Sequence, residues 1–225
     1  MTNQPHGGHD HGPGSSHRAL VPPDGEEEWD EWYAADERIW SGRPNGALVA
    51  EVDGVRPGRM LDVGCGEGAD AVWLASRGWQ VTALDVSDVA LDRARSAAAD
   101  AGVDVTWLHA GLIEAPLDGD RFDLVSLQYP ALRRTPEHDA ERALLSAVAP
   151  GGTLLAVFHA DVDVEWAEAH GLDPDDYVGH DHLAALLGEG WRVEKDERRP
   201  RNIEGGSGAH HMEDVVLKAR RLPEP

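Results

Sequence analysis

The sequence predicts an α/β protein built on a doubly wound, mostly parallel sheet of seven strands with an antiparallel carboxyl-terminal strand. Two observations lead to this prediction. After residue 58, short β-rich runs alternate with stretches whose apolar residues recur at helical spacing. The last two strand-like runs, 191–200 and 210–221, are joined by RNIEGGSGA with no helix between them, so they should pair as an antiparallel hairpin.

The individual elements follow from local signals along the chain. Strands are expected where β-rich runs are flanked by glycine or proline, at 59–64, 80–86, 103–110, 121–129 and 152–160. Helices are expected at 68–78 and 87–102, because Gly78 and Gly102 stand where a helix C-cap belongs. A third helix is expected to open near Pro136 and to close at Pro150-Gly151. This alternation of strands and helices favours parallel neighbours.

The first residues, 1–25, consist of Gly, Pro, His and Ser with few apolar side chains. Such a segment cannot bury enough surface to offset the entropy of ordering it, so we expect a disordered tail. It contains four histidines that could gather a metal ion, but no cysteine accompanies them and the glycines leave the ligands unfixed. We therefore assign no metal site to the histidines, which are His6, His9, His11 and His17.

Residues 26–58 form the next segment, which opens with EEEWDEWYAADERIW. Its spacing is helical from Trp29 to Tyr33 and again from Asp36 to Trp40. An amphipathic segment of this kind must bury its aromatic side chains, and the ligand edge of the sheet is otherwise open. We predict a helical lid with Trp29, Tyr33 and Trp40 as its buried face.

The composition excludes several classes of protein. In 225 residues, 42 Asp and Glu against 20 Lys and Arg give a formal net charge of −22, which would repel a nucleic-acid backbone. The single cysteine allows no intrachain disulfide, and no apolar run approaches the roughly 20 residues of a membrane span. The amino terminus lacks the apolar core of a signal peptide, so we expect a cytoplasmic protein without nucleic-acid or membrane partners.

The motif DVGCGEG places three glycines, Gly64, Gly66 and Gly68, directly between a strand and a helix. Glycine allows the tight turn and the close approach of a ligand, and the following helix offers free N–H groups. The same letters can be aligned with the dinucleotide fingerprint, with Ala69 in its last position. An NAD-linked oxidoreductase is therefore an open alternative.

Carboxylates around this motif help to distinguish a dinucleotide from a positively charged ligand. Asp85 ends the second strand, 21 residues after Gly64, where the ribose hydroxyls of either cofactor would need an acceptor. Asp62 precedes the first glycine and Glu67 lies inside the loop. These two carboxylates would oppose a pyrophosphate but suit a ligand that carries a sulfonium and an ammonium group.

LDVGCGEG, Asp85 and the terminal hairpin together resemble the class I S-adenosylmethionine-dependent methyltransferases, over about residues 27–221. Within them, IWSGRPNGALVAEV looks like the small-molecule group that includes the tellurite-resistance and thiopurine methyltransferases. The resemblance implies a Rossmann-like methyltransferase domain over 59–222. It also implies S-adenosylmethionine as cofactor, S-adenosylhomocysteine as product, and a small-molecule nucleophile as the methyl acceptor.

The resemblance also implies where the cofactor lies. The glycines would line its methionine part, Asp62 would face its amino group, Asp85 would accept from the ribose, and Val86 would lie against the adenine. Many members have an acidic residue after the third strand, where this chain has Gly111, so neighbouring backbone groups or Glu114 would have to substitute. Cys65 is expected to contribute its backbone and not a nucleophilic thiol. The expected cofactor contacts are Tyr33, Trp40, Asp62, Gly64, Cys65, Gly66, Gly68, Asp85, Val86, Gly111, Leu112, Ile113 and Gln128.

The methyl acceptor is expected beyond the carboxyl ends of the strands, as ligands of open α/β sheets are. This rule favours Tyr129 and His159, with Trp29 of the lid, as substrate contacts. Methyl transfer is an in-line displacement that needs a proton acceptor only when the nucleophile is a neutral alcohol, phenol or amine. His210 and His211, at the turn of the hairpin, are the candidates for that catalytic role.

Three hypotheses remain open from the sequence alone. The first is a methyltransferase that acts on a small molecule, as a monomer or a homodimer. The second is the NAD-linked oxidoreductase, and the third is a non-catalytic binding protein on a methyltransferase-like fold.

Overall fold

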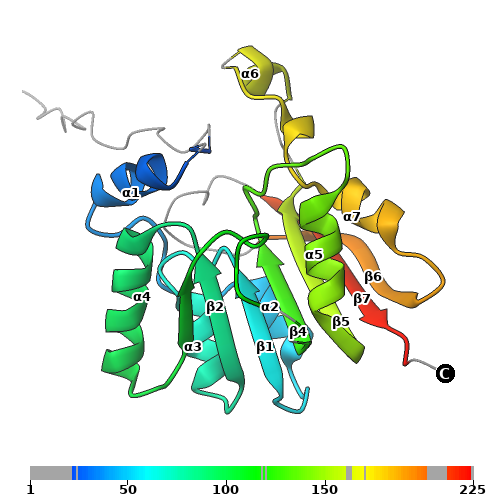
Figure 1. The fold of residues 1–225 in the computed structure, drawn as a ribbon, viewed down its shortest axis with the longest axis horizontal. Coiled ribbons are helices and arrows are strands. Elements are labelled where there is room, and N and C mark those ends of the chain that lie inside the picture. The colour runs from blue at the N-terminus through cyan, green and yellow to red at the C-terminus, as the bar shows by residue number, and fades with distance from the viewer. Residues whose placement is uncertain are drawn as a thin grey trace, which may run out of the picture.

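A computed structural model describes residues 22–23, 25–117, 119, 121–160, 164–169, 171–201 and 212–223. Its centre is a seven-stranded sheet in the order β3-β2-β1-β4-β5-β7-β6 (Figure 1). The first five strands are parallel, and β7 runs antiparallel to both of its neighbours, β5 and β6. The predicted fold class is therefore confirmed. The strands are β1 (Arg59–Val63), β2 (Gln80–Asp85), β3 (Thr106–His109), β4 (Phe122–Gln128), β5 (Val148–His159), β6 (Trp191–Pro200) and β7 (Glu213–Arg221).

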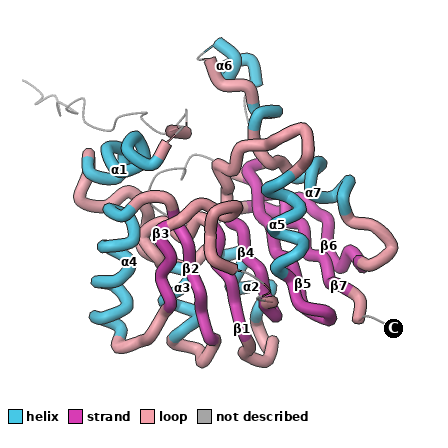
Figure 2. Tube along the Cα trace, viewed as in Figure 1, coloured by secondary structure: helices cyan, strands magenta, loops and turns pink. Residues whose placement is uncertain are grey.

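Helices cover both faces of this sheet, with α2 and α3 on one face and α5 and α7 on the other (Figures 1 and 2). α4 packs beside α3, and its ends follow the expected signals. Ser87 caps its amino terminus by accepting from the backbone N–H of Ala90, and Gly102 closes it with φ +66°. The helices are α1 (Glu26–Ala34), α2 (Gly46–Val52), α3 (Ala69–Ala75), α4 (Asp88–Ala101), α5 (Asp139–Ala147), α6 (Val164–Ala169) and α7 (His180–Leu186), with a 3₁₀ turn, η1 (Pro174–Asp176).

Two apolar clusters hold these layers together. On one face, Leu48 of α2 and Leu74 of α3 pack with Met60 of β1, and all three are fully buried. On the other face, Leu144 of α5 and Leu183 of α7 pack with the strands in the same way. Burying both faces explains why the central strands read as nearly continuous apolar runs.

α1 stands apart from these layers, above α4 and the carboxyl ends of β2 and β3 (Figure 1). Its Asp30 carboxylate accepts from Ser87 Oγ at 2.6 Å and from the backbone N–H of Val89 at 3.2 Å. α1 is thereby attached to the amino terminus of α4, at the ligand edge of the sheet. The division of the chain into tail, lid and cofactor domain stays a prediction.

Two expected elements differ from the structure. α1 ends at Ala34, so the stretch from Asp36 to Trp40 is not helical. The reason is that Arg93 of α4 binds the carbonyl oxygens of Tyr33 and Asp36, at 2.8 and 2.6 Å, and so stabilises the end of the helix there.

The third predicted helix is also shorter than expected. α5 begins at Asp139 and ends at Ala147, and β5 starts at the next residue, so Pro150 and Gly151 belong to the strand. The pairing of β4 with β5 shifts register at this point, and an irregularity of this kind accommodates a proline that cannot donate a ladder hydrogen bond.

Sequence reasoning assigned no element to the 164–186 region, which contains α6, η1 and α7. Residues 1–21 and 24 of the predicted tail and the catalytic candidates His210 and His211 lie outside the described residues. None of the helices within the described ranges has the length and hydrophobicity that crossing a membrane requires.

Candidate cofactor and acceptor sites

The glycine loop connects β1 to α3. Gly64, Gly66 and Gly68 all have positive φ, at +68°, +52° and +79°. The backbone N–H groups of Gly64 and Cys65 donate to the carbonyl oxygen of Leu84 at 2.9 and 3.0 Å, which holds the loop against β2. A Cβ on Gly68 would lie 2.7 Å from the Cβ of Ala94 on α4. The loop therefore needs glycine for its conformation and, at Gly68, for close packing.

Three buried carboxylates surround this loop: Asp62 on β1, Asp70 on α3 and Asp85 on β2. Asp85 accepts from the backbone N–H groups of Gly66 and Ser87 at 2.8 and 3.0 Å. Asp70 accepts from the backbone and side-chain nitrogens of Asn45 at 2.7 and 2.8 Å. The Oδ2 atom of Asp62 is buried and has no hydrogen-bond partner among the described residues.

The electrostatics of these carboxylates favour a cation. Burial raises the pKa of Asp62, and the neighbouring Asp70 and Asp85 raise it further. Burial also raises the pKa of Asp70 and of Asp85, although each carboxylate is partly stabilised by the hydrogen bonds that it accepts. A positively charged group placed here would relieve this repulsion and could bond the unpartnered oxygen of Asp62. These residues fit the ammonium and sulfonium of S-adenosylmethionine.

Cys65 lies at the centre of the same loop. Burial raises the pKa of its thiol well above the ordinary value, and the Asp85 and Asp62 carboxylates raise it further. A thiol held in the neutral form is a poor nucleophile, which agrees with the expectation that Cys65 serves the loop through its backbone.

The Glu67 carboxylate, which sequence reasoning expected to suit a cationic ligand, is engaged by other parts of the chain. Its carboxylate accepts from the backbone N–H groups of Ile39 and Trp40 at 3.1 and 3.0 Å and pairs with Arg93 at 2.7 Å. Arg93 in turn donates to carbonyl oxygens at the end of α1. Glu67 therefore joins the glycine loop to the segment that follows α1.

The aromatic side chains of the amino-terminal segment gather over the glycine loop. Tyr33 is 3% exposed, and its hydroxyl accepts from Trp40 Nε1 at 3.1 Å. A Cβ on Gly66 would meet both groups, at 2.9 and 3.0 Å, so they lie directly against the loop. Trp29 packs in the same cluster, with its ring centroid 6.1 Å from that of Tyr33 and the two ring planes tilted by 34°. Trp40 was expected to be buried but is 37% exposed, because its ring lies at the rim of the cluster.

The expected adenine site lies at the ends of β2 and β3. Val86 approaches Gly111, where an added Cβ would come within 3.8 Å of Val86 Cγ1 and would collide with the Glu114 carboxylate. Glu114 thus brings an acidic group to the position that Gly111 leaves without one. Leu112 is buried in the core and Ile113 is 54% exposed, so their side chains diverge.

A second cluster lies at the ends of β4 and β5. Tyr129 stacks on His159, with ring centroids 4.3 Å apart and an interplanar angle of 15°. The Tyr129 hydroxyl donates to the Asp214 carboxylate at 3.0 Å, and burial raises the pKa of that hydroxyl well above its ordinary value. The guanidinium of Arg201 lies 4.4 Å from the Tyr129 ring and 3.1 Å from His159 Nδ1. The Nε atom of Arg201 is 4.0 Å from Asp214.

Gln128 precedes this cluster on β4. Its Nε2 donates to Ser126 Oγ at 3.0 Å, while its Oε1 is buried without a partner in the described part of the chain. Tyr129 has a φ of +51°, which is unusual for a residue with a side chain and turns the chain sharply at the end of the strand.

The structure thus assembles most predicted residues into two groups, and it adds several that sequence reasoning missed. Asp70 could have been noticed two residues after Gly68, in the first turn of the expected helix. Asn45, Arg93, Arg201 and Asp214 had no local signal, because their partners are distant in the sequence.

Comparisons with known proteins point to a methyltransferase domain. A family model described as a methyltransferase domain matches residues 60–152. The chain is 34% identical over 119 residues to a protein named ribosomal RNA small subunit methyltransferase C of Alcanivorax borkumensis, covering 50% of this chain and 36% of that one. It is 33% identical over 126 residues to the ubiquinone/menaquinone biosynthesis C-methyltransferase UbiE of Ectopseudomonas mendocina, covering 53% and 47%. The chain thus spans less than half the length of these curated relatives.

Solved structures resemble almost the whole chain. One of them comes from work on the conversion of a disulfide bond into a thioacetal group during echinomycin biosynthesis. It superposes with a TM-score of 0.68 at 27% sequence identity, and the match covers 89% of this chain and 94% of the solved chain. The N-methyltransferase NodS from Bradyrhizobium japonicum, in complex with S-adenosyl-L-homocysteine, has a TM-score of 0.66 at 18% identity and covers 89% and 100%. These findings do not favour an NAD-linked oxidoreductase or a non-catalytic protein. Together with the match of residues 60–152 to a methyltransferase domain, the buried carboxylates around the glycine loop support S-adenosylmethionine as the cofactor.

Proposed function

We propose that the protein transfers the methyl group of S-adenosylmethionine to a small-molecule nucleophile by in-line displacement. The observation that carries this proposal is the set of three buried carboxylates, Asp62, Asp70 and Asp85, around the glycine loop. Crowded carboxylates stabilise a bound cation and oppose a pyrophosphate. This preference supports S-adenosylmethionine over a dinucleotide.

When bound, the cofactor supplies an electrophilic methyl group on a positively charged sulfur. The residues of this chain would hold and orient it. Asp85 would accept from the ribose hydroxyls, Asp62 would bond the ammonium group, and the glycine loop would leave room for the methionine part. Tyr33 and Trp40 would close over the loop, where aromatic faces also attract a cation. Orientation of this kind can supply about 7–11 kcal/mol of the reaction barrier.

The acceptor would bind at the second cluster, against Tyr129 and His159, with Trp29 of the lid as a further contact. Support comes from position, since Tyr129 follows β4 and His159 ends β5, and ligands of open α/β sheets bind at the carboxyl ends of the strands. If the nucleophile is a neutral alcohol, phenol or amine, His210 or His211 would accept its proton. These two histidines lie outside the described residues, and their role is proposed from the sequence alone.

A small acceptor is favoured over a nucleic acid by charge. The net charge of −22 works against approach to a phosphate backbone. The name of the ribosomal RNA relative describes that protein, of which the matched part is 36%. The narrower resemblance to tellurite-resistance and thiopurine methyltransferases stays a prediction, because the matched family model describes a methyltransferase domain in general. A monomeric or homodimeric state and a cytoplasmic location also stay predictions.

Calorimetry tests the cofactor and a methyl-transfer screen tests the acceptor. We expect S-adenosylmethionine and S-adenosylhomocysteine to bind at micromolar concentration and NAD to show no binding. The screen measures release of S-adenosylhomocysteine with thiols, halides, tellurite, phenols and, as the opposing arm, ribosomal RNA. Binding of NAD alone would contradict the methyltransferase proposal. Turnover with RNA and with none of the small molecules would contradict the acceptor class.

A further inference from the structure

A single side chain of α4, Arg93, bonds both the glycine loop and the lid. α4 lies beneath α1, so its side chains reach the lid directly (Figure 1). Arg93 Nη1 donates to the Glu67 carboxylate at 2.7 Å. Its Nη2 donates to the carbonyl oxygens of Tyr33 and Asp36 at 2.8 and 2.6 Å. The planar guanidinium offers several donors in a fixed fork and stays charged, so it can hold the acid and both carbonyls at once.

The lid also binds Glu67 directly. The backbone N–H groups of Ile39 and Trp40 donate to its carboxylate at 3.1 and 3.0 Å. With Arg93 the carboxylate accepts three hydrogen bonds, and 9% of the Glu67 side chain is exposed. A carboxylate this far removed from water needs a basic partner, and Arg93 provides it. The acid and the arginine therefore act as one pair that joins the loop to the lid.

This pair determines where two aromatic side chains of the lid lie. The carbonyl of Tyr33 belongs to the last turn of α1, which has no basic residue of its own, so the positive charge of Arg93 stabilises that end of the helix. The hydrogen bond from the Trp40 backbone to Glu67 fixes the second aromatic residue. As a result, the Tyr33 hydroxyl and Trp40 Nε1 lie 2.9 and 3.0 Å from the place that a Cβ on Gly66 would take.

We propose that Arg93 is a positioning residue that keeps the lid closed on the glycine loop, and that S-adenosylmethionine and S-adenosylhomocysteine enter and leave when its bonds open. This inference rests on the proposed function, in which Tyr33 and Trp40 close over the cofactor. Tyr33 is 3% exposed and lies directly against the loop, so a ligand covered by it can be exchanged only after this contact opens. The bonds of Arg93 therefore limit the rate of cofactor exchange.

Two further contacts bind the lid on either side of this pair. In α1, the Asp30 carboxylate accepts from Ser87 Oγ at 2.6 Å, at the start of α4. Before α2, the backbone and side-chain nitrogens of Asn45 donate to Asp70 at 2.7 and 2.8 Å. These contacts can persist while the bonds of the arginine break. We therefore expect the opening movement within residues 33–44 and not in the whole lid.

Surface plasmon resonance with the full-length protein measures this exchange, and S-adenosylhomocysteine is the probe. Arg93→Met removes the three donated hydrogen bonds but keeps a long unbranched side chain. Because these bonds join parts of the protein, they hold the lid closed with and without the ligand, and both rate constants depend on the open state. We expect association and dissociation each to become about 10- to 100-fold faster, the effect of losing a hydrogen bond to a charged group. The dissociation constant should change less than either rate constant.

The two rate constants distinguish lid opening from damage to the site. A distorted site would bind the probe more slowly, because fewer molecules would have the competent conformation. A folded Arg93→Met protein that associates more slowly, or that exchanges the probe at the rate of the unmodified protein, would therefore overturn the proposal. Circular dichroism reports whether each variant is folded.

Arg95→Met is the matched control. Arg95 lies on the same helix and pairs with Asp88 and Asp92 of α4 at 3.1 and 2.6 Å. Since exposed pairs of this kind contribute little, both rate constants should stay within about 2-fold of those of the unmodified protein. Arg93→Lys keeps a cation for Glu67 but lacks the planar fork, so exchange should become slow again in part. If Arg95→Met accelerates exchange as much as Arg93→Met does, the lid contacts of Arg93 are not the cause and the proposal is wrong.

Amide hydrogen exchange tests the closed lid in the unmodified protein, without any substitution. The N–H groups of Ile39 and Trp40 bond Glu67 while the lid is closed, so bound S-adenosylhomocysteine should slow their exchange with solvent. If S-adenosylhomocysteine binds and leaves the exchange of both groups unchanged, the lid does not close over the cofactor and the proposal fails. Absence of any binding would instead contradict the methyltransferase proposal itself, so the two failures are distinguishable.

Discussion

The two halves of the ligand edge carry opposite electrostatic designs. In the cofactor half, Asp62, Asp70 and Asp85 are buried together, and none forms an ion pair with another described residue. In the acceptor half, Asp214 is the buried acid, and Arg201 lies close enough to compensate it. The first half thus favours a cation, whereas in the second the acid has a basic residue beside it. We propose that charge selects the cofactor, and that hydrogen bonding and stacking select the acceptor.

Removing one charge from the cofactor half should have the largest effect. Asp85→Asn replaces the carboxylate proposed to accept from the ribose, and hydrogen bonds to charged groups contribute about 1.5–3 kcal/mol each. We expect the dissociation constant for S-adenosylmethionine to rise by about 100-fold, measured by calorimetry. Asp88→Asn is the control, because that exposed carboxylate pairs with Arg95 away from the loop. Equal affinities in the two variants would contradict the proposed cofactor half.

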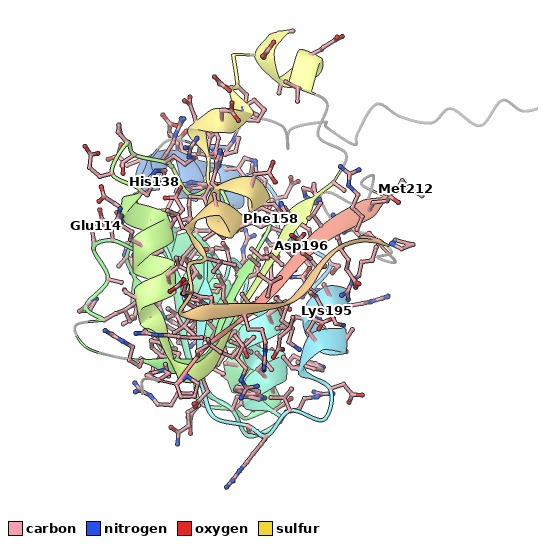
Figure 3. The ribbon with its side chains drawn as sticks, turned by 90° about the vertical axis from the view of Figure 1, so that its right-hand side faces the viewer. Glu114, His138, Phe158, Lys195, Asp196 and Met212 are labelled. Atoms are coloured by element: carbon pink, nitrogen blue, oxygen red, sulfur yellow. The ribbon has the colours of Figure 1, made fainter. Side chains whose placement is uncertain are left out.

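Glu51 joins α2, which follows the lid, to the strands of the acceptor half. Its carboxylate accepts from Lys195, Arg199 and Lys218 at 2.7, 2.7 and 3.3 Å (Figure 3). These bonds outweigh the cost of burial and lower the pKa of Glu51 from 4.5 to about 2. Because the folded pKa is depressed, the stabilisation is complete above the unfolded value and is lost as the pH falls from about 5 toward 2.

Glu51→Gln should therefore lower the free energy of unfolding at pH 7 by about 2–3 kcal/mol, measured by urea denaturation. The stability of the variant should also decline less between pH 5 and 3 than that of the unmodified protein. Glu197→Gln is the matched control, since this half-exposed carboxylate pairs only with Arg199 among the described residues and should contribute less than about 1 kcal/mol. Parallel pH curves for Glu51→Gln and the unmodified protein would contradict the role of Glu51.

Close packing in the cofactor half can be separated from backbone strain by two glycines. Gly68 and Gly78 both have positive φ, but only at Gly68 would a Cβ collide, with Ala94 at 2.7 Å and Trp107 at 3.0 Å. Gly68→Ala should destabilise the protein by about 1–3 kcal/mol more than Gly78→Ala, measured by thermal or urea unfolding. Similar losses would mean that strain alone explains the need for glycine.

A substitution in the lid should have the smallest effect on cofactor affinity. Trp40→Ala removes a half-exposed ring whose Nε1 donates to Tyr33, and neutral hydrogen bonds contribute about 0.5–1.5 kcal/mol. We expect the affinity for S-adenosylmethionine to fall by about 3- to 10-fold while circular dichroism stays unchanged. Trp73→Ala is the control, because Trp73 lies on α3 under Arg77, away from the lid cluster. Unchanged affinity in Trp40→Ala would remove Trp40 from the cofactor site.

The predictability of the two halves differs for a physical reason. The glycine loop, Asp62 and Asp85 lie within 24 residues of one another, and each has a local signal in strand ends and turn residues. The same holds for α4, because its caps, Ser87 and Gly102, are residue types that mark helix ends in a sequence. Local conformational preference and hydrophobic period are properties of neighbouring residues, so they can be recognised without the fold.

Long-range partners could not be recognised in this way. Glu67 was expected to face the cofactor, yet it binds backbone N–H groups of the lid 27 and 28 residues away. The end of α1 depends on Arg93, whose bond to the Tyr33 carbonyl spans 60 residues. Tyr129 meets Asp214 across 85 residues, through a sheet order that no local pattern specifies.

By itself, the sequence determined the alternation of strands and helices, the glycine loop and the acidic residues that flank it. Only the tertiary structure decided which of those acids face each other and which are used to hold the lid. It also decided that Arg201 reaches His159. A side chain's charge and hydrogen-bonding capacity are encoded locally, but its partners depend on how distant strands pair, and the partners set its chemistry.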